Sequence, residues 1–386
     1  MEGKTMATIK QYTKKDGSKA WQFQTYLGIN QATGKEIRTT RRNFKTKKEA
    51  QLELNRLLVD YEKNGLQKKE KITYQELYDE WIIQYKNTVK ESTFVKTKRI
   101  FKNHILLYFG QMRIETIEIK HCQDAINQWS KSLKRFKTIM NYAGMIFDYA
   151  IRIGLIALNP TKLVTRPIVK DEIEEKESNF YTKEELTLFF NYLEKENEPK
   201  IYTLFRILAF TGMRKGEALA LTWNDINFEQ QTITINKTLT RGEHSKLIIQ
   251  TPKTGNSKRV VSIDDKTLSI LKQWRTTQKK QYFILGFNTM NKQQLIFSNL
   301  QNDYLQPTIT RKYIKLICEK YELKEITTHG FRHTHCSLLF ESGATMKEVQ
   351  DRLGHSDVKT TMNIYAHVTK DYKEKTAKVF AAYIGI

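Results

Sequence analysis

The sequence predicts an α+β protein of several domains: a small β-rich N-terminal domain, a helical bundle, and a mostly helical C-terminal domain with a three-stranded β insertion. Three observations support this fold class. The chain has 386 residues, which suits two or three domains. It contains 19 Phe, 19 Tyr and 5 Trp, enough to build hydrophobic cores. Short β-rich runs occur in two regions only, and the remainder follows helical periodicity.

Composition excludes several classes of protein. No apolar run approaches the ~18 residues that cross a membrane, and the first residues lack the apolar segment of a secretory signal. Three cysteines (Cys122, Cys318 and Cys336) cannot form a disulfide framework and lack CxxC spacing. We therefore expect a soluble protein of a reducing compartment, with no membrane partner.

Positive charge is concentrated in the first 170 residues. The formal net charge is +23; residues 1–65 carry 14 basic and 7 acidic side chains, and residues 66–170 carry 19 and 9. Lys and Arg contacts to phosphates release counterions, so a nucleic acid explains this excess. The alternative is a basic surface that serves solubility, but the excess is larger than solubility requires.

Residues 8–44 predict three strands, and residues 46–63 predict a helix. The runs TIKQYT, AWQFQTYLG and KEIRTTRRNF are separated by turn residues, and Thr46 can cap the helix that follows. A small sheet of this kind can lie in a major groove of DNA. Basic and aromatic side chains interleave on its strands: Lys10, Tyr12, Trp21, Phe23, Arg38, Arg41 and Arg42.

Residues 73–160 predict a helical bundle, with Gly110 and Gly154 between helices and Asn159-Pro160 at the end of the last one. The acid-rich run DEIEEKE at 171–177 marks a linker. A bundle with cations on its outside suits a clamp around a DNA duplex. The expected cations are Lys96, Lys98, Arg99, Lys102, Lys131, Lys134, Arg135 and Lys137.

The C-terminal domain starts near residue 178, and its strands are expected in the runs QTITINKTL, KLIIQTPK and KRVVSI.

Before these strands, an apolar helix breaks at Thr211-Gly212, and Arg214 falls in the first turn of the next helix. A cation there opposes the helix dipole, whereas a bound anion would reverse that cost. Glu217 lies within reach of Arg214; the alternative for this pair is a surface salt bridge.

A second helix start, in the run TTHGFRHTHCSLLFE, also gathers basic groups. We expect Thr328 to cap the helix, with His329 and Arg332 in its first turn. His329 and His333 have the spacing of a zinc pair, and Cys336 is near. The glutamate of an HExxH site is missing, however, and no third ligand has suitable spacing, so no metal is expected. For His333 and His335, packing or helix-end hydrogen bonds are favoured instead.

The run TMKEVQDRLGHSDVKTTMNIYAH carries the last candidates. Thr345 and Glu348 form a capping box, and Gly354 stops the helix. His355 follows at once, and Tyr365 lies ten residues further along. A helix-turn-helix regulator is the alternative, but the second helix would offer only Lys359 as a basic side chain before Tyr365.

Together these residues supply what metal-free phosphodiester cleavage needs. Guanidinium groups can stabilise the charge on a pentavalent phosphorus, a tyrosine can attack it, and an imidazole can move the proton near neutral pH. A lysine can protonate the leaving 5′ oxygen.

The chain resembles the tyrosine recombinases of the phage and integrative-element integrase group. The motifs that carry the resemblance are TGMRKGEAL, TPKTGNSKR, HGFRH and LGHSDVKTTMNIYAH. The resemblance implies that two guanidiniums hold the scissile phosphate, one histidine is an acid/base and another hydrogen-bonds the phosphate. By this resemblance, Arg214 and Arg332 hold the phosphate, His329 is the acid/base and His355 hydrogen-bonds the phosphate. Lys253 is the general acid, Tyr365 is the nucleophile and Glu217 supports Arg214. Lys258, on the same turn, is the alternative to Lys253.

The resemblance also implies an architecture: an arm-type DNA-binding domain at 1–65, a helical core-binding domain at 71–168 and a catalytic domain at 178–386. Strand exchange would pass through a 3′-phosphotyrosine without cofactor or metal, to integrate or excise a mobile element. The implied partners are double-stranded attachment-site DNA, three further copies of the chain, and, as additional options, an excisionase and a host DNA-bending factor. The expected location is the bacterial cytoplasm, at the nucleoid. A type IB topoisomerase and a non-catalytic DNA-binding regulator are the rival functions.

Overall fold

The structure is a computed structural model, and it describes residues 7–29, 36–64, 72–168, 178–252 and 258–354, with Met362 and Ile384. These residues fall into two compact units: residues 1–83 with 100–167, and residues 84–99 with 168–386. No helix among the described residues combines the length and apolar character that a bilayer crossing requires.

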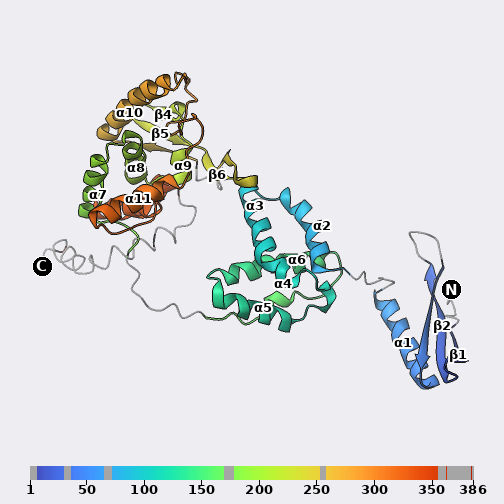
Figure 1. The fold of residues 1–386 in the computed structure, drawn as a ribbon. Helices are drawn as coiled ribbons and strands as arrows, with labels where there is room; N and C mark the ends of the chain where they lie inside the picture. The colour runs from blue at the N-terminus through green and yellow to red at the C-terminus, as the bar shows by residue number, and fades with distance from the viewer. Residues whose placement is uncertain are drawn as a thin grey trace. The chain divides into compact units, whose positions relative to one another are not determined.

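The predicted N-terminal strands and helix are confirmed. An antiparallel sheet in the order β1-β2-β3 is covered on one face by α1 (Figure 1). Thr46 caps this helix, because its hydroxyl accepts a hydrogen bond from the amide of Glu49 at 3.1 Å. The elements are β1 (Ala7–Thr13), β2 (Lys19–Ile29), β3 (Glu36–Phe44) and α1 (Lys47–Asn64).

The two faces of this sheet have different characters, and they divide the basic and aromatic side chains that the sequence shows interleaved on its strands. Phe23 is fully buried against α1, with Trp21 packed beside it. Arg41 is the cross-strand partner of Phe23 and hydrogen-bonds Glu53 of α1, so it also belongs to the covered face. Lys10 and Arg38 are exposed, and their partners on β2 are Gln22 and Tyr26. These two partners alternate with the covered residues of β2, so Lys10 and Arg38 lie on the open face.

The helices expected in residues 73–160 are confirmed, and all eight cations named in this region are exposed. Residues 72–83 and 100–167 share an aromatic core: Tyr74, Phe109 and Phe147 are fully buried and their rings are in contact. The elements are α2 (Tyr74–Lys86), α3 (Glu91–Ile100), the π turn η1 (Phe101–Ile105), α4 (Leu106–Phe109), η2 (Ile114–Thr116), α5 (Ile119–Ser132), α6 (Phe136–Arg152) and η3 (Pro160–Lys162).

The last helix of the bundle ends earlier than expected. It stops at Arg152, and Gly154 follows with a φ of 77°. Asn159 does not terminate this helix but starts a short 3₁₀ turn, where its side-chain oxygen accepts a hydrogen bond from the amide of Thr161 at 3.0 Å.

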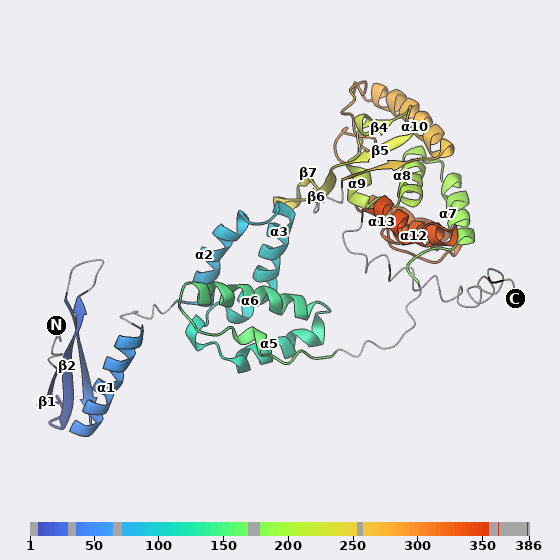
Figure 2. The ribbon, with the colours of Figure 1, turned by 180° about the vertical axis from the view of Figure 1, so that it is seen from behind.

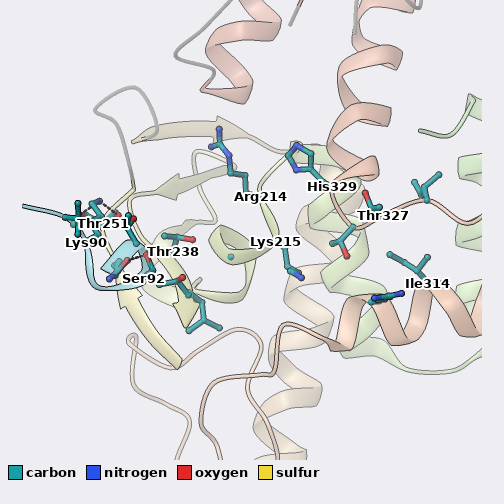
Figure 3. A pocket seen from close by; sticks show the side chains of 18 of the residues that line it. Lys90, Ser92, Arg214, Lys215, Thr238, Thr251, Ile314, Thr327 and His329 are labelled. Atoms are coloured by element: carbon teal, nitrogen blue, oxygen red, sulfur yellow. Dashed lines mark hydrogen bonds between the residues drawn. The ribbon is translucent and has the colours of Figure 1, made fainter. Parts of the chain in front are cut away.

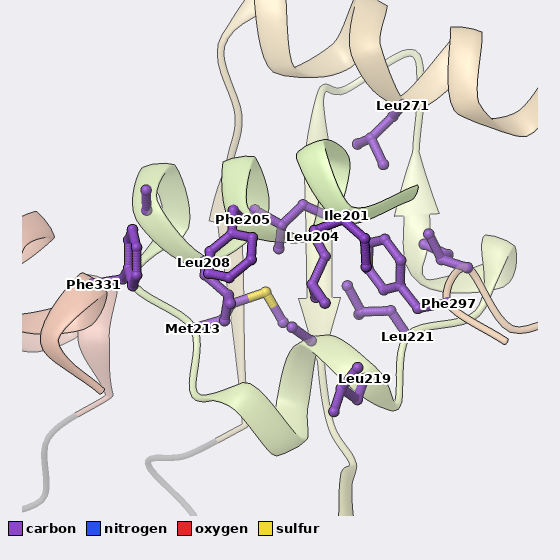
Figure 4. Close-up of a cluster of buried hydrophobic side chains, with 14 of the residues drawn as sticks. Ile201, Leu204, Phe205, Leu208, Met213, Leu219, Leu221, Leu271, Phe297 and Phe331 are labelled. Carbon is purple, nitrogen blue, oxygen red and sulfur yellow. The ribbon is translucent and has the colours of Figure 1, made fainter. Parts of the chain in front are cut away.

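The C-terminal domain is built around α8, whose buried residues Leu204, Phe205 and Leu208 pack against Phe331 of α12 and Leu271 of α10 (Figure 4). Helices α12 and α13 lie side by side (Figure 2). The helices are α7 (Lys183–Lys195), α8 (Pro199–Thr211), α9 (Lys215–Leu219), α10 (Asp265–Ile284), α11 (Ile309–Tyr321), α12 (Gly330–Glu341) and α13 (Met346–Leu353), with 3₁₀ turns η4 (Trp223–Asp225) and η5 (Glu243–Ser245).

The β insertion is divided differently from the prediction. The run QTITINKTL forms two strands that belong to different sheets, because it breaks at Asn236 and Lys237. Lys237 turns inward there and forms a 2.7 Å ion pair with the buried Asp225. A three-stranded sheet has the order β4-β5-β8, and β6 pairs with β7 alone. The strands are β4 (Ile226–Asn227), β5 (Thr232–Ile235), β6 (Thr238–Arg241), β7 (Leu247–Gln250) and β8 (Arg259–Ser262).

Candidate active site

The first basic group of the site depends on a glycine. Helix α8 ends at Gly212, which has a φ of 65°. A Cβ atom there would lie 2.5 Å from Leu353 and 2.7 Å from His335, so both the backbone conformation and the packing require glycine. The chain can therefore reverse within two residues and present Arg214 at the start of α9.

Arg214 is the residue that precedes α9, rather than a member of its first turn as expected. Its backbone amide donates to Oε2 of Glu217 at 3.0 Å, and its Nη1 donates to Oε1 at 2.9 Å. The expected pairing of these two residues is confirmed. Only 3% of the Glu217 side chain is exposed, which rules out the alternative of a surface salt bridge.

A second arginine, which the sequence analysis missed, shares this carboxylate. Arg259 at the start of β8 donates from Nη2 to Oε2 of Glu217 at 3.0 Å, and its side chain is 6% exposed. Burial acts to raise the pKa of Glu217, but Arg259 and then Arg214 outweigh burial and hold this pKa below its ordinary value. Arg259 is the last residue of the motif TPKTGNSKR, and its position in that motif was the available signal.

Arg332 of α12 is 1% exposed and lies against two helix ends. Its Nη1 donates to the carbonyl of Gly212 at 2.8 Å, and its Nη2 donates to the carbonyl of Leu353 at 2.7 Å. Burial, followed by the charges of Arg214 and Arg259, lowers the pKa of Arg332 to about 9. The guanidinium therefore remains charged at neutral pH.

His329 lies immediately before α12 and makes an edge-to-face contact with His333, with ring centroids 4.7 Å apart. Desolvation, followed by the neighbouring His333 and Arg332, lowers the pKa of His329 to about 4. The free imidazole is consequently neutral at physiological pH. Thr328 does not cap the helix as expected: its hydroxyl bonds Thr310, and the Thr327 hydroxyl accepts from the amide of Gly330.

His335 is a structural residue, as favoured from the sequence. Its Nδ1 is 2.9 Å from the carbonyl of Ala209, and its Nε2 accepts a hydrogen bond from Nε of Arg352 at 3.0 Å. Burial and the charge of Arg352 lower the pKa of His335 to about 3. Among the described residues, no three His, Cys, Asp or Glu side chains gather in a way that could hold a metal ion.

Arg214 and His329 line a common cavity of about 990 Å³, together with Lys215 and Thr327, in the unit that contains residues 168–386 (Figure 3). The structure thus gathers Arg214, Glu217, His329 and Arg332. Lys258 is exposed at the start of the segment leading into β8. The other three candidates, Lys253, His355 and Tyr365, lie outside the residues that the structure describes.

Comparison with protein families identifies the chain. Residues 179–371 match a model of the phage integrase family. The chain belongs to the phage integrase family. Residues 73–130 match the phage integrase N-terminal SAM-like domain, and residues 8–61 match an arm DNA-binding domain.

Individual relatives of this integrase are themselves named integrases. The ICEBs1 integrase of Bacillus subtilis (strain 168) is 30% identical over 362 residues, which cover 92% of this chain and 95% of that protein. The integrase of Staphylococcus phage L54a is 30% identical and covers 78% of this chain and 90% of the phage protein. The integrase is a site-specific recombinase of the tyrosine class, an enzyme that breaks and rejoins DNA. The topoisomerase and regulator alternatives are not favoured.

Solved structures share the fold. A Tn1549 transposon integrase in complex with a circular intermediate DNA has a TM-score of 0.67 at 23% identity, covering 80% of this chain and all of that chain. A lambda integrase tetramer bound to a Holliday junction has a TM-score of 0.54 at 17% identity, covering 92% and 94%. The expected fold class, with a small β-rich domain, a helical region and a mostly α domain with small sheets, is confirmed.

Proposed function

We propose that this integrase cuts each strand of a DNA attachment site with Tyr365 and rejoins it by the reverse reaction. The supporting observation is the arrangement of Arg214, Glu217, Arg332 and His329, in which one guanidinium comes from the start of α9, and the other guanidinium and a neutral imidazole come from the start of α12. Such a set suits a phosphate whose charge increases in the transition state.

The chemical step balances without a cofactor. The Tyr365 hydroxyl oxygen attacks the phosphorus, a phosphorus–oxygen bond to tyrosine forms, and the bond to the 5′ oxygen breaks. His329 accepts the phenolic proton, and Lys253 donates a proton to the leaving 5′ oxygen. Arg214, Arg332 and His355 bind the phosphate oxygens. The 3′-phosphotyrosine conserves the energy of the phosphodiester, so rejoining needs neither ATP nor metal.

The protonation state of His329 in the DNA-free protein supports its role as the proton acceptor. With a pKa of about 4, its imidazole is neutral before DNA binds. An anionic phosphate close to the ring favours the protonated form, so the pKa of His329 rises when substrate is bound. The group therefore becomes a better base at the stage when a proton has to be moved.

The proposed assembly contains double-stranded attachment-site DNA and four copies of the chain. A lambda integrase relative is known as a tetramer on a Holliday junction and as a dimer on a core site. In our proposal, residues 1–65 bind arm-type DNA, residues 71–168 bind the core site and residues 178–386 carry out cleavage in the bacterial cytoplasm. An excisionase and a host DNA-bending protein would decide the direction of the reaction.

Two assays test this function. A plasmid carrying two attachment sites should yield a recombinant product with the native integrase and none with Tyr365→Phe. Relaxation of the plasmid without recombination would favour the topoisomerase reading. DNA binding with neither recombination nor an SDS-stable protein–DNA adduct would favour the regulator.

A further inference from the structure

The buried carboxylate of Glu217 is shared unequally between two arginines. Its Oε2 accepts from Nη2 of Arg259 and from the backbone amide of Arg214, both at 3.0 Å. Its Oε1 accepts from Nη1 of Arg214 at 2.9 Å. The side chain of Arg214 thus makes one contact with a carboxylate that could otherwise take the two-pronged guanidinium pairing.

Arg259 is fixed at its other end as well. Its Nε donates to the carbonyl of Arg352 in the last turn of α13 at 2.9 Å, and its backbone pairs with Ile235 across the sheet. Arg259 does not line the cavity that Arg214 and His329 share, as far as the described residues define that cavity. With 6% of its side chain exposed and its guanidinium bonded to Glu217 and to the Arg352 carbonyl, Arg259 acts on the site through the protein groups that it holds, and Glu217 is the one it shares with Arg214.

The exposure of the two arginines indicates a division of roles. The Arg214 side chain is 39% exposed and faces the cavity, whereas that of Arg259 is 6% exposed. If Arg259 were absent, Oε2 would lose a hydrogen-bond donor, and Arg214 could rotate a second guanidinium N–H onto it. That rotation would turn the donors of Arg214 away from the cavity and toward Glu217.

We propose that Arg259 is a positioning residue for cleavage: by occupying Oε2 of Glu217, it restricts Arg214 to one carboxylate contact and leaves the other guanidinium N–H groups to bind the scissile phosphate. This inference rests on the proposed role of Arg214. It adds a residue to the reaction that makes no contact with the reacting atoms, and it assigns Glu217 a dual function, since the same carboxylate anchors one arginine and orients the other.

The test uses the full chain and a nicked core-site duplex that traps the covalent intermediate. Single-turnover cleavage is measured for Arg259→Ala, Arg259→Lys and Arg214→Ala. Arg275→Ala is the matched control, because Arg275 packs on Trp223 and Phe228 away from Glu217. Each variant is assayed on the normal phosphate and on a substrate with a methyl group in place of one non-bridging oxygen. This replacement removes the charge that Arg214 has to neutralise.

On the normal phosphate, we expect Arg259→Ala to slow cleavage by ~10²-fold, comparable to the loss of a positioned electrostatic group. Arg259→Lys should recover part of the rate, because it restores a cation beside Glu217. On the methylated substrate, the deficits of Arg214→Ala and Arg259→Ala should both shrink, while any deficit of Arg275→Ala should be the same on the two substrates. Combining Arg214→Ala with Arg259→Ala should cost little more than Arg214→Ala alone.

The outcomes separate the inference from the function on which it rests. If only Arg214→Ala is relieved by the methyl group, Arg214 keeps its role and Arg259 has none in positioning it. If neither variant is relieved, the proposed role of Arg214 is wrong, and the inference is wrong with it. If Arg259→Ala fails to fold, Arg259→Lys provides the same comparison: cleavage at the native rate, or a deficit that the methyl group leaves unchanged, would overturn the proposal.

Discussion

Arg332 donates a hydrogen bond from Nη2 to the carbonyl of Leu353, 2.7 Å away, and this carbonyl is the last of helix α13. The Nη1 of the same guanidinium binds Gly212, where α8 ends. One buried cation therefore stabilises the C-terminal ends of two helices, where carbonyl groups lack partners and the dipole is negative. In the sequence, His355 and Tyr365 follow directly after the helix end that Arg332 binds.

This double role predicts a double defect for Arg332→Lys. An ammonium is a compact point charge and cannot reach both carbonyls in the geometry of a guanidinium. We expect the melting temperature of the integrase to fall and cleavage to decrease by ~10²-fold or more. Lys347→Ala, an exposed substitution on α13, is the control and should change neither. A variant that loses cleavage but melts at the native temperature would contradict the structural half of this role.

Two histidines whose pKa values lie below the ordinary value predict that acid destabilises the free protein. The pKa of His335 is about 3 in the folded chain and about 6.5 when unfolded, so the unfolded state takes up the proton first as pH falls. The stability that depends on neutral His335 is present above about pH 6.5 and is lost progressively toward pH 3. His329, with a pKa of about 4, adds to the loss in the same direction.

Thermal melting between neutral pH and pH 4 measures this effect. His335→Gln should be less stable than the native chain at neutral pH, but it should lose less stability on acidification. His104→Gln in the helical bundle is the control and should follow the native pH profile. An identical pH profile for His335→Gln and the native chain would show that His335 does not titrate on unfolding.

The assignment of the general acid is tested by changing the leaving group. Lys253→Ala should reduce cleavage by ~10²-fold or more, the usual contribution of a general acid. A substrate with sulfur at the 5′ bridging position should restore the rate, because a thiolate leaves without a proton. Lys258→Ala should cost little and gain nothing from sulfur. The reverse pattern would assign the general acid to Lys258 and leave the other residues of the site unaffected.

The arm domain is expected to be dispensable for chemistry. Deleting residues 1–65 removes seven net positive charges but no candidate site residue. We expect integration to be weakened or lost, while cleavage of a core-site suicide substrate remains. Circular dichroism of the truncated chain serves as the folding control. If the folded truncation cannot cleave the core site, the modular account is wrong.

The parts of the fold that the sequence predicted correctly are those that depend on local interactions. Thr345 and Glu348 form the expected capping box because both members lie in one helical turn. Arg214 and Glu217 pair for the same reason, being three residues apart. The β-rich runs and the turn residues between them also located the three N-terminal strands, since both are local properties of the chain.

The errors arose where distant segments compete for the same group. Thr328 was expected to cap α12, but its hydroxyl bonds Thr310 of α11. The N-cap position is held by His329 without a side-chain cap, and the Thr327 hydroxyl accepts from the amide of Gly330. The sequence showed that Arg41 is on a strand but not which face it takes, and its bond to Glu53 of α1 places it on the covered one. Arg259 and Glu217 are 42 residues apart, and only the folded sheet brings them together.

The covalent intermediate at Tyr365 is the most direct test of the account. The native integrase is incubated with a nicked core-site duplex, denatured in SDS and digested, and the modified peptide is sequenced by mass spectrometry. The account predicts a nucleotide joined to Tyr365 through its 3′ phosphate. Tyr365→Phe should form no adduct although it binds DNA like the native chain, and Tyr372→Phe should form a normal adduct. An SDS-stable adduct formed by Tyr365→Phe, or a modified peptide that contains Tyr372 instead, would contradict it.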